Sequence, residues 1–332
     1  MNNFDGYIQS KPMVDVLLAT YNGEKYLADQ LKSLYGQSYD KWRLLISDDG
    51  STDSTISILS EAARQGVWII DVTPNEKKHS ATKNFLYLLT RTDAEYVMFC
   101  DQDDVWNKDK IELSLSRILA MEVKYGKDTP LAVFGDSCVV DENLSIINPS
   151  FMSTLESDAR TITLPKLLIS NVVQGCTMMM NRALVNLAVS SSYSDSFEYH
   201  DYWLAALVLA TGHIEYIDEP LLLYRQHGDN VAGASERKSM MLKVRRGLMG
   251  LHERGRAQFV IRNSASFTDK AKALLNCGIT FSGEVTSILD EMSSFKSLPM
   301  IRRLQLIKSQ GLLDNKDVYS ASSQLVAWML VK

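Results

Sequence analysis

Cysteine is scarce in this sequence, and no two cysteines lie close together. The 332 residues include only Cys100, Cys138, Cys176 and Cys277, and there is no CxxC pair. This spacing indicates neither a disulfide framework nor a zinc site, and it is typical of a protein from a reducing compartment.

Hydrophobic targeting and membrane segments are also lacking. The opening stretch, MNNFDGYIQSKPM, has neither the basic region nor the apolar region of a signal peptide. No run approaches the roughly 20 apolar residues that a membrane-spanning helix needs. The longest candidate, 203–210, is better interpreted as a buried helix, so we expect a cytoplasmic protein.

Neither sign of charge dominates the composition. The formal net charge is −5, from 35 Lys and Arg against 40 Asp and Glu, so no basic field predicts a nucleic-acid partner. Hydrophobic residues make up 45% of the chain and charged residues 23%. This globular balance allows one large core and a smaller second one.

Short apolar runs alternate with segments of helical period near the start of the chain. Strands are predicted at 14–19, 42–47, 67–72 and 96–100, and helices at 24–35, from a cap at 52–54 to about 65, and at 82–89. Such alternation predicts βαβ units, and hence an α/β, Rossmann-like fold with a mainly parallel sheet flanked by helices.

The later sequence is less regular. It predicts a strand at 131–140, a short helix at 161–169, a strand of three methionines after Thr177, a buried helix at 199–210 and closing strands at 214–217 and 221–225. After Gly233 the chain becomes amphipathic and helical. Residues 236–256 hold seven Lys or Arg against two acids, interleaved with apolar residues.

Polar clusters follow three of the predicted strands. They are Thr20-Tyr21-Asn22, Asp48-Asp49 and the acidic stretch Asp101–Asp104. The ligand crevice of such sheets lies beyond the carboxyl ends of the strands, so all three clusters are expected on one rim.

The third cluster concentrates carboxylate oxygens. Asp101 and Asp103 are separated by one residue, and Mg²⁺ or Mn²⁺ is usually held by one or two carboxylates together with substrate phosphates. The alternative is a solvated acidic turn in which Asp104 or Asn107 caps a helix that begins near Lys108.

The first two clusters are suited to a nucleotide base. A carboxylate of Asp48 or Asp49 can accept a hydrogen bond from an imide N–H, and Gly50 permits a tight turn. Tyr21 offers a ring for stacking. The alternatives are a second capped turn and a rim aromatic that only packs.

Together these motifs resemble the family 2 glycosyltransferases, which have the GT-A fold. The resemblance covers residues 12 to about 232, and its matching stretches are Ala19–Gly23, Ser47–Ser51, Asp101–Trp106, Tyr199–Trp203 and Asp218–His227. It implies a GT-A domain at 1–232, with a nucleotide-sugar half at about 12–125 and an acceptor half at about 126–232. A helical C-terminal region at 233–332 follows.

The resemblance also implies roles for individual residues. Donor contacts are expected from Thr20, Tyr21, Asn22, Asp48, Asp49, Lys83, Asn84, Asp101 and Gln102. A divalent metal, Mn²⁺ or Mg²⁺, is expected on Asp101, Asp103 and His227, with Asn230 nearby. Asp201 matches the general base, although His200 precedes it where the family usually has Glu.

Three of these positions have simpler explanations in the sequence itself. Asp201 lies at the start of an apolar helix and can merely cap it. A histidine such as His227 is more often a surface-loop residue. Gln174-Gly175-Cys176 resembles the loop on the acceptor side, but Gly175 can equally mark a strand start where two backbones approach closely.

The first and third clusters are similar to those of bacterial rhamnosyltransferases that build surface polysaccharides. This similarity implies dTDP-L-rhamnose as the donor, with a UDP-hexose as the alternative. The basic, apolar segment after Gly233 predicts a peripheral helix on an anionic membrane, and hence a lipid-linked saccharide acceptor at the inner face of the cell membrane. A helical subdomain or a homodimer interface is the alternative.

Two other enzyme classes fit the sequence less well. A nucleotidyltransferase needs a glycine-rich, basic loop after the first strand, and a dehydrogenase needs GxGxxG there. The loop that is present, Thr20–Glu24, has one glycine and one acid.

Overall fold

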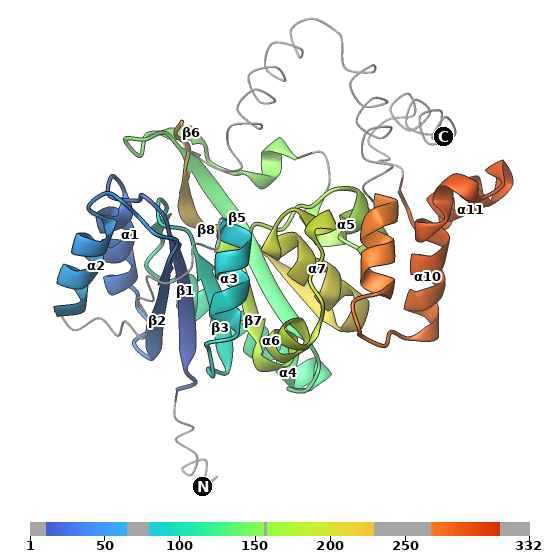
Figure 1. Ribbon diagram of the computed structural model, residues 1–332, viewed down its shortest axis with the longest axis horizontal. Coiled ribbons are helices and arrows are strands. Elements are labelled where there is room, and N and C mark those ends of the chain that lie inside the picture. Colours follow the sequence, from blue (N-terminus) through green and yellow to red (C-terminus); the bar gives the residue numbers. More distant parts are fainter. Residues whose placement is uncertain (1–10, 65–79, 156–157, 229–266, 313–332) are drawn as a thin grey trace, which may run out of the picture.

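The computed structural model describes residues 11–64, 80–155, 158–228 and 267–312 (Figure 1). The strand predicted at 67–72, the basic segment 236–256 and Asn230 lie outside the described residues.

One mixed sheet runs through the centre of the described molecule. Its eight strands are β1 (Val14–Thr20), β2 (Trp42–Asp48), β3 (Tyr96–Cys100), β4 (Val105–Trp106), β5 (Leu131–Val140), β6 (Ile146–Asn148), β7 (Met179–Asn181) and β8 (His213–Arg225). Their order is β2-β1-β3-β7-β5-β8-β4, and β6 pairs with β5. The long ladders, β1–β2, β1–β3 and β5–β8, are parallel. The antiparallel ladders contain only two or three residue pairs each, so the predicted mainly parallel sheet is confirmed.

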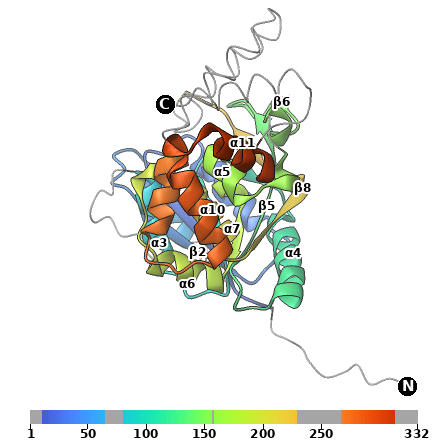
Figure 2. The same ribbon diagram turned by 90° about the vertical axis from the view of Figure 1, so that its right-hand side faces the viewer.

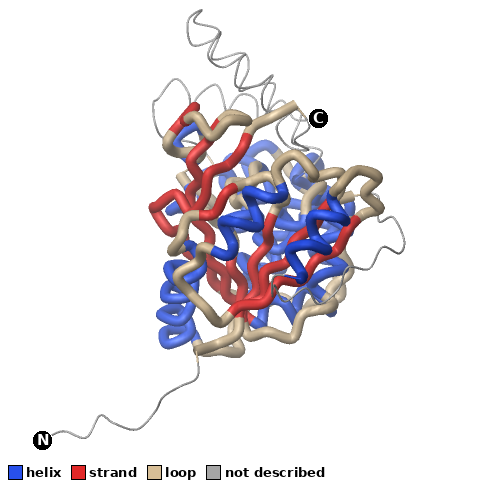
Figure 3. The backbone as a smooth tube through the Cα atoms, turned by 90° about the vertical axis from the view of Figure 1, so that its left-hand side faces the viewer, coloured by secondary structure: helices blue, strands red, loops and turns tan. Residues whose placement is uncertain are grey.

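Helices cover both faces of this sheet. They are α1 (Leu27–Tyr35), α2 (Thr55–Arg64), α3 (Ala81–Leu89), α4 (Lys110–Tyr125), α5 (Leu164–Ile169), α6 (Arg182–Ser190), α7 (His200–Thr211), a helix at 267–275, α10 (Gly283–Ser293) and α11 (Met300–Ser309). Short 3₁₀ turns occur at Met152–Thr154, Ala159–Thr161, Gly175–Thr177, Asp195–Phe197 and Phe295–Ser297. Figures 2 and 3 show the strands as a layer between helices.

The central strands divide their side chains between two hydrophobic cores. Successive side chains of a strand point to opposite faces of a sheet. In β1, Val16 and Leu18 therefore pack with α1, α2 and α4, whereas Leu17 packs with α3, α6 and α7. All three residues are fully buried. A strand covered on both faces reads as a continuous apolar run, which is why β1 and β3 were predictable.

The C-terminal helices continue the second of these cores. Phe267, Leu289 and Phe295 belong to the same buried cluster as Trp203 of α7. Figure 1 shows α10 and α11 outside α5 and α7, on the far side from β1 and β2. The predicted helical character of this region is therefore confirmed for its described part.

Two predicted boundaries are wrong. β8 is one strand where two were predicted, and its register with β5 shifts by two residues between Gly135 and Asp136, where Pro220 cannot donate to the ladder. The helix predicted near Lys108 begins at Lys110, and neither Asp104 nor Asn107 caps it.

Candidate active site

The loops after β1 and β2 are joined by hydrogen bonds at the carboxyl edge of the sheet. The Asp49 N–H donates to the Thr20 carbonyl (2.8 Å), and the Asn22 N–H donates to Ser51 Oγ (2.8 Å). In return, Asn22 Oδ1 accepts from the Thr52 N–H (2.8 Å). The two predicted clusters therefore form one framework.

Asp48 lies beneath this framework, and each oxygen of its carboxylate accepts two hydrogen bonds. Oδ1 accepts from the N–H groups of Gly50 (3.0 Å) and Ser51 (2.7 Å). Oδ2 accepts from the hydroxyls of Thr20 (2.8 Å) and Ser51 (2.6 Å). The side chain is 3% exposed. Asp48 therefore builds the turn from which Asp49 projects, and Gly50 supplies the positive φ of 83° that the turn requires.

Gln102 fastens the acidic turn after β3 to the loop after β1. Its side-chain amide pairs with the Tyr21 backbone, accepting from the N–H (2.9 Å) and donating to the carbonyl (3.0 Å). A Cβ on Gly23 would lie 2.3 Å from Gln102 Oε1, so any larger residue there would displace the Gln102 amide. The Tyr21 ring remains 54% exposed on the rim, where a base can stack on it.

Lys83 and Asn84 lie in the first turn of α3, beside the end of β2. The Asn84 side chain is buried and donates to the Ser47 carbonyl (2.7 Å). Its Oδ1 has no partner among the described residues. The Lys83 N–H is capped by Ser80 Oγ, and the Lys83 side chain is exposed. Asn84 therefore supports the rim from below, while Lys83 faces solvent.

Asp103 and His227 meet although 124 positions separate them in sequence. Asp103 Oδ2 lies 2.9 Å from His227 Nε2, and the His227 ring packs 4.6 Å from the Tyr26 ring. Neighbouring ligands of an octahedral ion with bonds of about 2.0–2.1 Å lie about 2.9 Å apart. The pair is thus spaced as two ligands of one metal ion.

Asp101 occupies an environment that disfavours its charge. Burial, and then the charges of Asp103 and Asp201, raise the pKa of Asp101 to about 7. A divalent cation would reverse this effect because it favours the ionised carboxylates. The convergence of these acids therefore fits a metal ion chemically.

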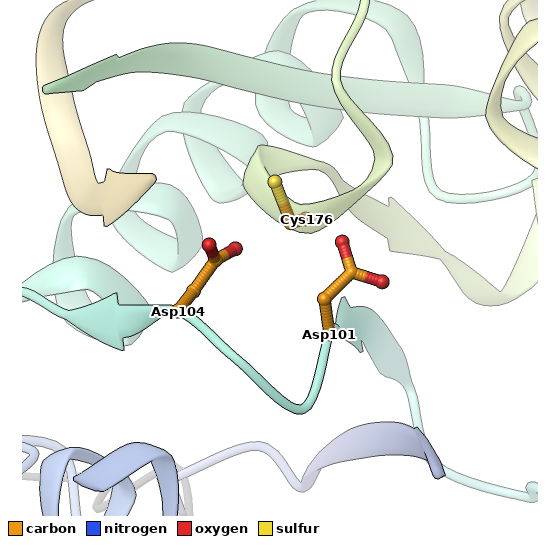
Figure 4. Close-up of side chains that lie close together, drawn as sticks. All are labelled: Asp101, Asp104 and Cys176. Atoms are coloured by element: carbon orange, nitrogen blue, oxygen red, sulfur yellow. The ribbon is translucent and has the colours of Figure 1, made fainter. Parts of the chain in front are cut away.

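Asp104 and Cys176 form a second group with Asp101 (Figure 4). Ligand atoms of the three residues lie within 4.8 Å of one another, and Figure 4 shows both carboxylates pointing to the side of the sheet where Cys176 lies. Burial holds the pKa of the Asp104 carboxyl and of the Cys176 thiol well above their usual ranges. A protonated thiol is a poor ligand for Mg²⁺ or Mn²⁺, which prefer oxygen. Asp103 and His227 offer an oxygen and a nitrogen as a pair. Among the described residues, however, Asp101 gathers with Asp104 and Cys176 rather than with that pair, so the predicted trio of Asp101, Asp103 and His227 is not brought together as one ligand group.

Arg225, at the end of β8, donates hydrogen bonds to the acidic turn from both its backbone and its side chain. Its Nε donates to the Asp103 carbonyl (2.8 Å), and its backbone N–H donates to Asp104 Oδ1 (3.2 Å). It also pairs with Asp29 (3.0 Å) and lies over the Tyr26 ring. Sequence reasoning assigned this buried arginine no role of its own.

Asp201 lies in the first turn of α7, opposite the acidic turn. Its Oδ2 accepts from the Gly175 N–H (2.9 Å) and its Oδ1 from the Tyr202 N–H (2.6 Å). Burial raises the pKa of Asp201 to about 6, although these two hydrogen bonds lower it. The N-cap of α7 is Tyr199, so Asp201 is not the helix cap that the sequence allowed. A carboxyl with this pKa can serve as a base near neutral pH.

Gly175 and His200 set the position of Asp201. A Cβ on Gly175 would lie 2.9 Å from His200 Nε2 and 3.0 Å from Asp201 Cβ. The close approach at Gly175 is therefore by side chains, and Gly175 begins a 3₁₀ turn rather than a strand. The His200 ring contacts two aromatic rings: its centroid lies 4.3 Å from that of Phe85 and 4.5 Å from that of Phe99. Burial lowers the pKa of His200 to about 3, so the ring is neutral and contributes packing rather than charge.

Lys110, also missed by sequence reasoning, lies fully buried behind the acidic turn. Its Nζ donates to the Cys176 carbonyl and lies 3.3 Å from the centroid of the Trp106 ring. A lysine at the start of a helix is normally solvent-exposed, so nothing local in the sequence indicates that Lys110 is buried.

Comparison with known sequences identifies a matching family and named relatives. The model of the family described as glycosyl transferase family 2 matches residues 15–131. A dTDP-rhamnosyl transferase, RfbG of Shigella flexneri, is 31% identical over 228 residues, which cover 66% of this chain and 74% of that protein. WfgD of Escherichia coli, named UDP-Glc:alpha-D-GlcNAc-diphosphoundecaprenol beta-1,3-glucosyltransferase, is 26% identical over 208 residues, covering 62% and 73%.

Solved structures share the fold at low sequence identity. TarS of S. aureus in complex with UDP-GlcNAc superposes with a TM-score of 0.57 at 16% identity, covering 96% of this chain and 90% of that one. The mannosyltransferase PcManGT of Pyrobaculum calidifontis, in complex with GDP-Man and Mn²⁺, gives a TM-score of 0.52 at 15% identity, covering 97% and 86%.

Proposed function

The chain belongs to glycosyl transferase family 2 and is a glycosyltransferase of the GT-A fold, and from this premise we propose an inverting transfer of L-rhamnose from dTDP-L-rhamnose. The observation that carries the proposal is the 2.9 Å contact of Asp103 with His227, beside Asp101, whose pKa the charge of Asp201 helps to raise. The rhamnosyl donor is supported by the name of the Shigella relative. The UDP-Glc named for the E. coli relative supports the alternative, a UDP-hexose.

Asp101, Asp103 and His227 would hold the divalent metal, Mn²⁺ or Mg²⁺. When bound, such an ion neutralises negative charge on a leaving diphosphate. The 2.9 Å spacing of Asp103 and His227 supports this assignment, as does the Mn²⁺ bound by the Pyrobaculum neighbour.

The loops after β1 and β2 would bind the nucleotide. The Tyr21 ring, exposed at the rim, would stack on the base, and Asp49 would accept a hydrogen bond from the base imide N–H. Thr20, Asn22, Asp48 and Gln102 would hold these two residues in place through the hydrogen bonds described above. Lys83 and Asn84 would lie on the donor side, at the first turn of α3.

Asp201 would act as the general base. Its carboxylate takes the proton of the acceptor hydroxyl as the oxygen forms a bond to C1 of the sugar. The bond between C1 and the diphosphate oxygen breaks on the opposite face, and the diphosphate leaves with the bonding pair. A pKa of about 6 leaves Asp201 mostly ionised at pH 7 while keeping it basic enough to accept a proton.

The acceptor would be a saccharide, in our proposal a lipid-linked one, used in bacterial surface polysaccharide synthesis at the inner face of the cell membrane. The diphosphoundecaprenol in the name of the E. coli relative supports it. No helix in the described ranges is long and apolar enough to cross a membrane. A peripheral membrane contact or a homodimer contact through the region after 232 is part of this proposal.

A donor panel tests the proposal directly. dTDP-rhamnose, UDP-glucose, UDP-GlcNAc and GDP-mannose are each offered with Mn²⁺, with Mg²⁺ and with EDTA, and released nucleotide diphosphate is measured. We expect dTDP release with either metal and none with EDTA. Faster release from a UDP-hexose would replace the donor, and pyrophosphate formation from nucleotide triphosphate would indicate a nucleotidyltransferase instead.

A further inference from the structure

A fully buried lysine, Lys110, lies next to the proposed catalytic site. Lys110 is the first residue of α4 and is 0% exposed. Burying an ammonium group costs free energy unless its surroundings compensate for the lost water. Here the Cys176 carbonyl accepts a hydrogen bond from Nζ, and the Trp106 ring lies beneath the charge.

Acids around the lysine complete this compensation. Burial lowers the pKa of Lys110 to about 8, and negative charge on nearby acids such as Asp104 and Asp101 opposes the shift. The ammonium form therefore predominates at pH 7. Figure 4 shows the two carboxylates extending toward the turn that carries Cys176.

The neighbour of Cys176 in sequence is the residue that holds the proposed base. The Gly175 N–H donates to Asp201 Oδ2 (2.9 Å), and a Cβ added at Gly175 would lie within 3.0 Å of both His200 and Asp201. One side of this turn thus contacts Asp201, and the carbonyl of its second residue is held by Lys110.

Lys110 also contacts the strand that follows the acidic turn Asp101–Asp104, the proposed metal-binding turn. β4 follows Asp104 directly, and its Trp106 ring is the one on which the ammonium rests. Lys110 therefore contacts both structures that must be aligned during transfer: the segment that presents Asp101 and Asp103, and the turn that orients Asp201.

We infer that Lys110 is a positioning residue that fixes the catalytic base relative to the metal-binding turn. The inference rests on the proposed function, because that function makes Asp201 the base. Lys110 itself touches neither substrate nor reacting atoms. Small displacements of a catalytic group reduce the rate of the chemical step more than they reduce donor binding.

Replacing the lysine with a side chain of similar length tests the inference. Lys110→Met keeps most of the buried stem but removes the charge and the donor. We expect kcat to fall about tenfold, with the donor KM within about twofold of wild type, since a misplaced base slows chemistry while the nucleotide loops remain intact. Lys108→Met is the matched control because Lys108 is an exposed lysine two residues earlier, and it is expected to retain wild-type kinetics.

Hydrogen exchange gives a readout that does not depend on activity. In the protein without donor or metal, we expect the amides of 175–178 to exchange faster in Lys110→Met than in wild type or Lys108→Met. The amides of β1 and β3 should be unchanged. Lys110→Gln, which retains an N–H donor, provides a second variant if Lys110→Met does not fold.

The outcomes separate this inference from the proposed function. Wild-type kcat with unchanged exchange at 175–178 would overturn the positioning role. So would faster exchange throughout the chain, since that indicates a general loss of stability. A wild-type protein that transfers no sugar from any donor would overturn the proposed function instead, and the exchange comparison would still show whether Lys110 holds the turn.

Discussion

The loops after β1 and β2, here called the nucleotide loops, and the acidic turn Asp101–Asp104 are neighbours on one rim of the sheet. Their polar groups differ in how many hydrogen bonds they make within the protein. In the loops, Asp48 accepts four hydrogen bonds, and Asn22 donates one and accepts two. Behind the acidic turn, Asp104 Oδ2 is buried without a partner among the described residues, and the pKa of Asp101 is raised. The loops have their polar groups paired within the protein, whereas in our proposal the acidic turn is further stabilised when a cation binds.

Removing Asp103 should have the largest effect, because it breaks the region that depends on a cation. We expect Asp103→Ala to lower kcat by about 1,000-fold or more while the fold survives, since a metal ion contributes several kcal/mol to the transition state. Measuring transfer at increasing Mn²⁺ and the circular dichroism spectrum checks both parts. Transfer at the wild-type rate and metal affinity would remove Asp103 from the metal site.

Neutralising Asp201 should have the next largest effect. Asp201→Asn retains an oxygen that can accept from the Gly175 N–H but loses the base, so kcat should fall by about 100-fold to 10,000-fold. Single-turnover transfer with saturating donor and metal measures the chemical step. Near-normal transfer by correctly folded Asp201→Asn would show that another group takes the proton.

A glycine change tests the nucleotide loops separately. In Gly23→Ala the new Cβ would meet the Gln102 amide, so Gln102 must release the Tyr21 backbone. We expect the donor KM to rise about tenfold, as for loss of one to two hydrogen bonds, with kcat changed less than twofold. Gly228→Ala is a matched control, since no atom of the described residues lies within 4 Å of its added Cβ.

Acid pH should inhibit transfer through Asp201. Its pKa of about 6 means that the base is ionised above pH 6 and protonated below it, so kcat should fall about tenfold per pH unit below pH 6. The profile is measured at saturating metal and donor. A rate that is flat from pH 7 to pH 5 would contradict the assignment of Asp201.

The smallest expected effect is on the stability of the metal-free protein. The folded pKa values of Asp101 (about 7) and Asp201 (about 6) lie above the ordinary 3.8. Between pH 4 and 7 the folded state therefore binds more protons than the unfolded state, and stability falls as pH rises. The melting temperature of metal-free protein should be lower at pH 8 than at pH 6. Added Mn²⁺ should raise it at pH 8, but not in Asp103→Ala.

The sequence predicted the rim because its signals are local. An apolar run followed by Asp48-Asp49 or by Asp101–Asp104 marks a strand and its carboxyl end, and parallel pairing brings such ends together. The contact between Asp103 and His227 was implied only by family resemblance, since nothing local to His227 indicates where its chain segment returns.

What the sequence could not predict depends on long-range packing. Arg225 and Lys110 are charged residues that helical or strand periodicity places on a surface, but backbone carbonyls and aromatic rings from distant segments enclose them. Likewise, the two strands predicted near the end of the sheet are one, because β5 is long enough to pair with both across a shift in register. The boundary proposed at residue 232 stays a prediction.

The helix that carries Asp201 is supported from outside by the last part of the described chain. Lys270 is 4% exposed and lies 4.6 Å from the Tyr202 ring, and the Cys277 carbonyl accepts from the Ser192 N–H (2.9 Å). A chain shortened at 266 would open the outer side of α7 to water immediately next to the base. The described C-terminal helices thus pack into the same core as the helix that carries the proposed base, and we expect a change in them that loosens α7 to slow transfer.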